Sequence, residues 1–548
     1  ETSVPLYRPL NLGATIMTVS HSYRALSEGG DGDGVEGYGH VLRDRRKVGE
    51  LGWRERLCRF FTPMRTIWMF VGVNILNYLD RGIIPGAPNQ FQSFIRNTIM
   101  IDENQESTYL GILQSVFIAS YSLAVIAAGN LVHKYPPFLV MGMGLAIWCV
   151  AVFISGAAQG WGSFWLLLFG RTLSGVGEAS FQCIAPAFIE DFSPPGQKVL
   201  MLGIFFSSIT VGTAGGYAYS AVISTSWGWA WSFWLEGVAM IPFVVICCLL
   251  PFKLNGDNSN GNNVRTASNH ASVSLSKEVS TIMTSPLFIN ISIGYSAYCA
   301  VLAGLSTFGP IFFQGLQLFD SERSASLHFS AIVALAGVIG TPIGGYISDR
   351  LAGDRATRDQ ILDTCLKIMA GSSLAGLAFA LASAYCQSKG PFLFLMGTAI
   401  MLLFLPTGCC TMAVMASVPS NMRATGVALS ILIMHLFGDV PSPVAVGWLK
   451  DRLAPRCNTK SIDGQEVLNP LCVFDGDGIR LTLVICLSYL AVTVLFWTVP
   501  ILFPDTCGKP AQDPDQFQSL NNGDLGKRKD SYRGLGDVPD KEMPVAAA

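Results

Sequence analysis

Residues 74–86 read NILNYLDRGIIPG, and this stretch decides how the whole chain is interpreted. Asp80 and Arg81 stand in the middle of a long apolar run, where each charge is costly if the run crosses a membrane. The composition favours a membrane, because 50% of the 548 residues are hydrophobic and 14% are charged, against about 25% charged residues in soluble chains. The net charge of −2 gives no reason to expect nucleic-acid binding.

The distribution of apolar residues predicts an all-α membrane protein. A membrane helix needs about 20 mostly apolar residues. Residues 253–285 are rich in Asn and Ser and lack apolar periodicity, so we expect a solvated linker that divides the helices into two six-helix bundles. Such a division is typical of secondary transporters. Twelve segments are expected to span the membrane, near 67–87, 108–132, 138–158, 163–188, 199–223, 230–252, 287–313, 328–350, 361–384, 391–416, 423–449 and 480–503.

The charges that flank the spans predict the topology. Basic residues before the first span place the N-terminus in the cytosol by the positive-inside rule. An even number of spans returns the C-terminus to the same side. The expected parts are a cytosolic tail (1–66), an N-terminal bundle (67–252), a cytosolic linker (253–286), a C-terminal bundle (287–503) and a second cytosolic tail (504–548).

Four charged residues in two spans form the first candidate site. Arg171 and Glu178 stand seven residues apart in the fourth span, so they share one helical face. If this span packs against the first, the two residues balance Asp80 and Arg81 in a neutral cluster that could line a water-filled cavity. Such a cluster can bind a polar headgroup, and its carboxylates can carry a proton. A static ion-pair network that locks the bundle is the alternative.

The eleventh span carries a second titratable pair. His435 and Asp439 stand four residues apart and are therefore neighbours on one face. Histidine titrates near neutral pH, so His435 is a candidate for proton transfer, and an interhelical histidine with a purely structural role is the alternative. The stretches at 212–216 and 340–345 have the small-xxx-small spacing that allows close helix contact, either as plain packing or at an interface between halves.

The loops add two expectations. Cys457 and Cys472 lie in the polar loop 450–479, which is expected to face the lumen or the outside, where a disulfide can form. The tails and long loops contain no P-loop, HExxH motif or nucleophile elbow, so we expect neither an enzyme nor a protein with a cofactor or metal.

The loop GGYISDRLAG, residues 344–353, resembles the signature of the major facilitator superfamily. The resemblance implies that Gly345, Asp349 and Arg350 form a gating motif with a cytosolic charge relay. The equivalent loop after the second span reads GNLVHKYPPF, so that His133 and Lys134 stand where Asp-Arg is usual. This departure puts a gate of the usual type in the N-terminal half in doubt.

Four longer strings resemble the Spinster family over about residues 67–503: NYLDR, LQSVFIASY, GRTLSGVGEASFQCIAPAFIEDF and MRATGVALSILIMHLFGDVPSP. The resemblance implies an alternating-access transporter of lysophospholipids, sphingolipids or sphingosine-1-phosphate, coupled to protons in the lysosomal or late endosomal membrane. It also implies a central polar site formed by the residues that match the family pattern, which are Asp80, Arg81, Arg171, Glu178, His435 and Asp439.

The residues themselves suit an amphiphilic substrate. Arg81 and Arg171 can bind a phosphate, which would compete with the carboxylates of Asp80 and Glu178 and so couple binding to protonation. The tenth span is nearly apolar, so we expect the acyl tail in the C-terminal half.

Short motifs in the tails bear on localisation. Tyr-x-x-bulky tetrapeptides begin at Tyr7, Tyr23, Tyr38 and Tyr532, and they favour sorting adaptors and endolysosomal routing, although tail composition alone could produce them. Two alternative functions stay open at this point. One is a general exporter of sugars or drugs, and the other is a lipid sensor that does not transport.

Overall fold

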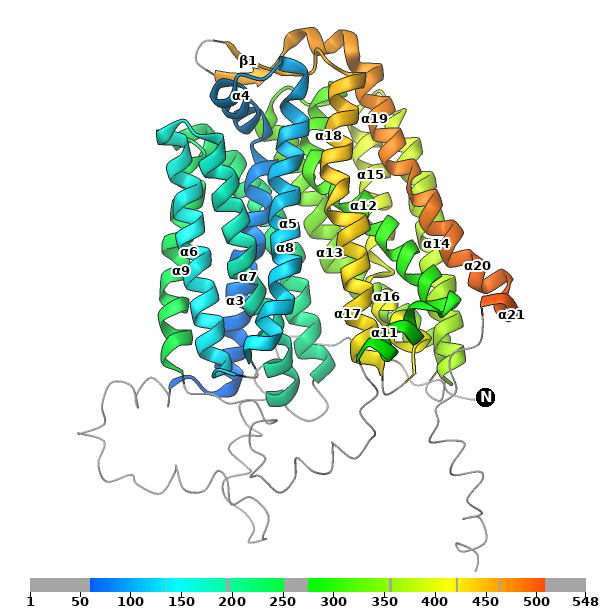
Figure 1. Ribbon diagram of the computed structural model, residues 1–548. Helices are drawn as coiled ribbons and strands as arrows, with labels where there is room; N and C mark the ends of the chain where they lie inside the picture. Colours follow the sequence, from blue (N-terminus) through cyan, green and yellow to red (C-terminus); the bar gives the residue numbers. More distant parts are fainter. Residues whose placement is uncertain are drawn as a thin grey trace, which may run out of the picture. The chain divides into compact units, whose positions relative to one another are not determined.

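The computed structural model describes residues 60–132, 134–193, 198–250, 275–353, 357–419, 422–462 and 465–507. From residue 61 onward these residues belong to one compact unit, which is almost entirely helical (Figure 1). Most of both predicted tails and most of the predicted linker lie outside the described residues, and so do Tyr7, Tyr23, Tyr38 and Tyr532.

Six long helices make up the N-terminal half. They are α3 (Pro63–Gly86), α5 (Glu106–Val132), α6 (Pro137–Trp161), α7 (Phe164–Phe192), α8 (Lys198–Trp227) and α9 (Ala230–Leu249). The C-terminal half begins with three long helices, α12 (Pro286–Gly315), α13 (Glu322–Ala352) and α14 (Arg358–Ala384).

The last three long segments of the C-terminal half are interrupted. The first consists of α15 (Lys389–Phe404) and α16 (Thr407–Ser417). The third consists of α19 (Gly476–Ser488) and α20 (Leu490–Leu502), and the short helix α21 (Pro504–Cys507) follows it. The middle one runs through α17 (Arg423–Met434), a π-helical turn η4 (His435–Asp439) and α18 (Pro441–Leu453).

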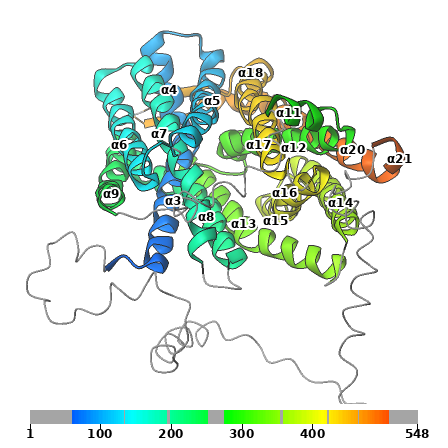
Figure 2. The same cartoon turned by 60° about the horizontal axis from the view of Figure 1, so that its bottom comes forward.

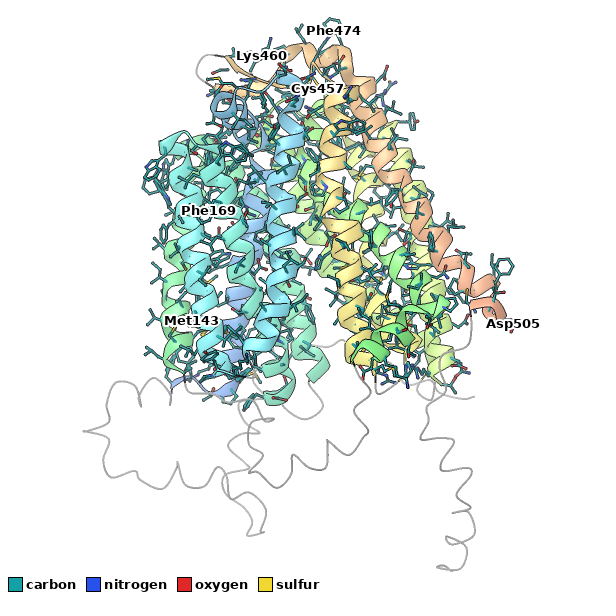
Figure 3. All side chains as sticks on the ribbon, viewed as in Figure 1. Met143, Phe169, Cys457, Lys460, Phe474 and Asp505 are labelled. Carbon is teal, nitrogen blue, oxygen red and sulfur yellow. A yellow bond between two sulfur atoms is a disulfide. The ribbon has the colours of Figure 1, made fainter. Side chains whose placement is uncertain are left out.

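Ten of the twelve long segments in the described part are long and apolar enough to cross a membrane. The remaining two are α3 and α7, whose hydropathy is lowered by the charged pairs in their interiors. The predicted twelve spans are consistent with this arrangement. Side chains such as Met143 and Phe169 project outward from the N-terminal half, as expected of a surface that faces lipid (Figure 3).

Three elements differ from the sequence expectations. Helix α4 (Pro88–Ile99) is amphipathic and follows α3 directly, in the stretch between the first two expected spans. Helix α11 (Leu275–Met283) lies in the predicted linker, because Ile282 is buried and Glu278 accepts a hydrogen bond from the Thr425 hydroxyl at 2.9 Å. The loop between α18 and α19 contains an antiparallel hairpin of β1 (Thr459–Ile462) and β2 (Gln465–Leu468), with the short helix η5 (Pro470–Asp475) after it.

Glycines allow close helix packing inside each half. Gly212 and Gly216 of α8 lie against the backbone of α3, and Gly340 and Gly344 of α13 lie against carbonyl groups of α15 and the adjoining turn. The two predicted small-xxx-small stretches therefore serve packing within a half. A different glycine, Gly337, packs across the halves against Thr210 of α8.

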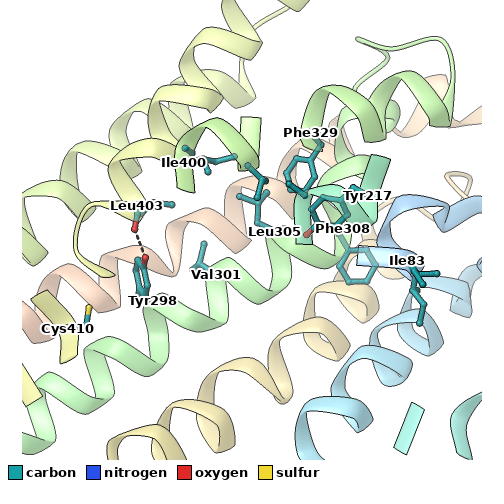
Figure 4. Packing of buried hydrophobic residues seen from close by; sticks show 14 of the residues in the cluster. Ile83, Tyr217, Tyr298, Val301, Leu305, Phe308, Phe329, Ile400, Leu403 and Cys410 are labelled. Carbon is teal, nitrogen blue, oxygen red and sulfur yellow. Dashed lines mark hydrogen bonds between the residues drawn. The ribbon is translucent and has the colours of Figure 1, made fainter. Parts of the chain in front are cut away.

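The two halves meet along two helix pairs, α5 with α18 and α8 with α13 (Figures 1 and 2). An apolar cluster joins them, in which the Tyr217 ring lies 5.2 Å from the Phe329 ring (Figure 4). The Tyr217 hydroxyl also lies 2.7 Å from the Ser306 hydroxyl of α12.

Polar contacts between the halves gather at the end that carries α4 and the β-hairpin, which we call the hairpin end (Figure 3). There the backbone N–H of Asn89 donates to Glu322 at 2.6 Å. Asp451 of α18 accepts hydrogen bonds from the backbone N–H groups of Ser107 and Thr108 and so caps α5 from the other half. The halves are thus held together at the hairpin end.

Candidate functional site

The four charged residues predicted in the first and fourth spans come together as two ion pairs. Arg171 Nη1 donates to both carboxylate oxygens of Asp80 at 2.7 Å. Arg81 Nη2 donates to Glu178 Oε1 at 2.8 Å. Consecutive residues of a helix point about 100° apart, and seven residues rise about 10 Å along an axis. Asp80 and Arg81 can therefore reach two separate partners on the same face of α7.

The two pairs differ in their access to solvent. The side chains of Asp80, Arg171 and Glu178 are fully buried, whereas the Arg81 side chain is 21% exposed. We expected all four groups to line one cavity, but Arg81 is the member of the cluster that reaches it. The ring of Phe117 lies 5.0 Å from the Arg81 guanidinium and 4.6 Å from that of Arg171, and it helps to keep the second pair out of the cavity.

Aromatic rings enclose Arg81. Its guanidinium lies 4.4 Å from the centre of the Tyr78 ring and 5.3 Å from that of Tyr121. Cation–π contacts of this kind stabilise a partly desolvated cation. Together with Glu178 they hold Arg81 in one position at the edge of the cavity.

The cavity lies between the halves and has a volume of about 300 Å³. Its polar side contains Arg81, Gln114 and Asp439. Much of its apolar wall comes from the C-terminal half, where we expected an acyl tail to bind (Figure 4). The apolar residues of that wall include Leu302, Leu305, Phe329, Val333, Ile400 and Phe404.

His435 and Asp439 occupy the π-helical turn η4. His435 Nδ1 lies 3.0 Å from Asp439 Oδ2, so the predicted proximity on one face is present. The His435 ring also contacts the Tyr121 ring of the other half at 5.9 Å. Because π turns displace side chains from regular helical positions, they are frequent at functional sites. Here the turn places Asp439 on the cavity wall, in contact with His435.

The remaining predicted residues lie away from this cavity. Cys457 and Cys472 form a disulfide at the hairpin end (Figure 3). Arg350 Nε donates to the hydroxyl of Tyr346 in its own helix at 3.1 Å. A side chain at Gly345 would meet open space. The side chain of Asp349 and all of His133 lie outside the described residues, so the charge relay stays a prediction.

Several polar residues around the ion pairs were not predicted from the sequence. Gln182 donates to Asn74 Oδ1 at 2.8 Å and to Glu178 Oε1 at 3.3 Å, which links α7 to α3. Glu236 of α9 lies within electrostatic range of Asp80, Arg171 and Glu178 and is 2% exposed. A lone acid in the apolar stretch 230–252 is the signal that could have identified it.

The sequence profile of the family described as the Major Facilitator Superfamily matches residues 70–441. The chain belongs to this superfamily. It is 29% identical over 444 residues to a plant protein named probable sphingolipid transporter spinster homolog 2 (Arabidopsis thaliana), with 77% of this chain and 88% of the relative covered. It is also 29% identical over 401 residues to human protein spinster homolog 1, with 70% and 72% covered.

The structure is similar to the crystal structure of a bacterial homologue of the human lysosomal transporter Spinster, in an inward-facing and unoccupied conformation. The TM-score is 0.64 at 19% sequence identity, and the match covers 84% of this chain and 100% of that one. These relatives confirm the resemblance to the Spinster family. The chain is a membrane transporter of the Spinster type rather than an enzyme.

Proposed function

We propose that this protein moves lysophospholipids or sphingolipids, including amphiphiles like sphingosine-1-phosphate, by proton-coupled alternating access in the lysosomal or late endosomal membrane. The observation that carries the proposal is the position of Arg81. It is a cation at the polar side of a cavity whose other walls are largely apolar. This combination suits a molecule with an anionic headgroup and a hydrocarbon tail.

The ion pairs supply a way to couple lipid and proton. A phosphate that binds Arg81 competes with Glu178 for the same guanidinium, because both ligands are anionic oxygens that accept its N–H groups. Release of Glu178 removes its counter-charge, and a buried carboxylate without a counter-charge favours the protonated form. Headgroup binding and proton binding therefore support each other at this pair.

The hydrocarbon tail is assigned to the C-terminal wall of the cavity. Phe329, Phe404 and the leucines of α12 offer an apolar surface there, with few polar groups to desolvate. Asp439 stands near the polar side, and His435, which contacts it, can exchange a proton with it. In this assignment His435 and Asp439 form a second proton-handling pair.

Two further observations support the substrate class and the localisation. A plant relative is named a probable sphingolipid transporter, and the bacterial relative is described as a homologue of a lysosomal transporter. The tyrosine tetrapeptides of the tails provide candidate signals for sorting adaptors. The gating role of Gly345, Asp349 and Arg350 belongs to the same proposal, as does the cytosolic position of both termini.

Reconstitution into liposomes tests the proposal. Labelled lysophosphatidylcholine, sphingosine-1-phosphate and glucose are each supplied with and without an inward proton gradient. We expect movement of one or both lipids, acceleration by the gradient, and loss of movement in Arg81→Ala. Movement of glucose alone would point to a general sugar exporter. Absence of any movement by folded protein would point to a lipid sensor, and either result overturns the proposal.

A further inference from the structure

Glu236 is a buried acid for which the proposed lipid site has no role. Glu236 is 2% exposed, and neither of its carboxylate oxygens has a hydrogen-bond partner among the described residues. The backbone N–H of Asp80 lies near this carboxyl. An ionised carboxylate in such a position would lack both water and a direct counter-ion, which is strongly unfavourable.

The groups that face Glu236 come from all the helices around α9. They are Asp80 of α3, Cys149 of α6, Arg171 and Glu178 of α7, and Tyr219 of α8. Arg171 is the cation in this set, and its Nη1 is already paired with Asp80. No cation of the set is therefore left to balance a charge on Glu236 while that pair is intact.

The charges of the buried cluster do not balance when every group is ionised. The cluster contains two guanidinium groups, Arg81 and Arg171, and each is paired with one carboxylate. Glu236 is the third acid, so the fully ionised cluster has one negative charge more than it has positive charges. One bound proton makes this buried cluster neutral.

We propose that Glu236 is a proton-binding site of the transporter, and that it holds its proton while Arg171 is paired with Asp80. The proposal rests on the proton coupling of the proposed function and assigns one of its sites. Arg171 Nε and Nη2 have no hydrogen-bond partner in the described part of the chain, so they are available to a second carboxylate.

The exchange that follows is a balanced proton transfer. The O–H bond of Glu236 breaks, the proton goes to the Asp80 carboxylate, and Arg171 turns from Asp80 to the new carboxylate of Glu236. The net charge of the cluster does not change. Because Asp80 lies on α3 and Glu236 on α9, the two states of Arg171 favour different packing of these helices.

Infrared difference spectroscopy on the full-length protein in nanodiscs tests the proposal without any lipid substrate or gradient. A protonated carboxyl has a C=O stretching band that shifts in D₂O. We expect this band in the wild type at neutral pH, its loss in Glu236→Gln, and its retention in the control Asp363→Asn, which removes an exposed acid of α14 outside the cluster. In Asp80→Asn the band should also be lost, because Arg171 then pairs with Glu236 and ionises it.

A wild-type spectrum without the band, or a band that persists unchanged in Glu236→Gln, overturns the proposal. Retention of the band in Asp80→Asn overturns the exchange with Asp80. If Glu236→Gln does not fold, Glu236→Asp keeps the acid and should move the band, and an unmoved band assigns it to another residue. If the wild type shows the band but moves no lipid in liposomes, the proposed function is contradicted, and the assignment of the proton to Glu236 still stands.

Discussion

The Arg81 guanidinium and the Glu178 carboxylate lie 2.8 Å apart, and this ion pair joins the cavity to the buried interior of the N-terminal half. Its neighbour in the chain, Asp80, is paired with Arg171, and both of those side chains are fully buried. The two pairs therefore have different expected roles. The first can exchange its partner for a ligand, whereas the second must stay paired or be compensated.

Glu178→Gln is expected to abolish the pH dependence of transport while leaving expression at the organelle or cell surface intact. The amide keeps the size of the side chain and can still accept a hydrogen bond from Arg81, but it cannot bind a proton reversibly. Flux into liposomes across a series of pH values measures the effect. Asp363→Asn, which changes an exposed acid of α14, is the control and should keep the wild-type profile. An unchanged pH response in Glu178→Gln would mean that another acid or His435 binds the proton that makes transport depend on pH.

Arg171→Met is expected to destabilise the protein by roughly 3–5 kcal/mol, because it leaves the buried Asp80 carboxylate without its partner. The double variant Asp80→Leu with Arg171→Met should recover much of this loss, since apolar residues can replace a buried ion pair. Unfolding of purified protein in detergent measures both. A double variant no more stable than the single one would show that the pair itself contributes the stability.

Gly111→Ala is expected to loosen the hairpin end. A Cβ at Gly111 would meet the backbone carbonyl of Pro443 in α18, so α5 and the other half must separate. Overpacking of this kind typically costs about 1–3 kcal/mol. The matched control on the same helix is Gly129→Ala, where a Cβ has no neighbour within 4 Å. Thermal stability and lipid flux are compared, and equal values for the two variants would contradict the expectation.

The Cys457–Cys472 disulfide is expected to hold the hairpin in place for its contacts with the N-terminal half. Thr459, two residues after Cys457, donates its backbone N–H to Glu106 at 3.0 Å and accepts from Arg96 through its carbonyl. Loss of a cross-link with a sequence separation of 15 residues should destabilise this end by about 3 kcal/mol.

Cys457→Ser is compared with wild type on gels run with and without reductant. We expect a mobility difference in the wild type and none in the variant, together with faster proteolysis of the hairpin. Cys386→Ser, which removes a free cysteine, is the control. A wild-type mobility that does not respond to reductant would mean that the cross-link does not form.

The sequence by itself determined the class of fold and the polar residues of the first and fourth spans. Long apolar segments have few stable arrangements in a membrane, and a charge such as Asp80 inside one is conspicuous because it is costly there. The same logic indicated that Asp80 and Arg81 need partners. It could not say which of the two residues pairs with Arg171 and which with Glu178.

Only the tertiary structure decided access and charge balance. It placed Arg81 on the cavity and packed Arg171, the partner of Asp80, against Phe117 of α5. The spacing of residues in one segment cannot predict how a helix is rotated about its axis or which helix it packs against. The tertiary structure also brought Glu236 of α9 next to the cluster. Which charges share one low-dielectric volume depends on contacts between helices distant in sequence, so the excess acid became visible only in three dimensions.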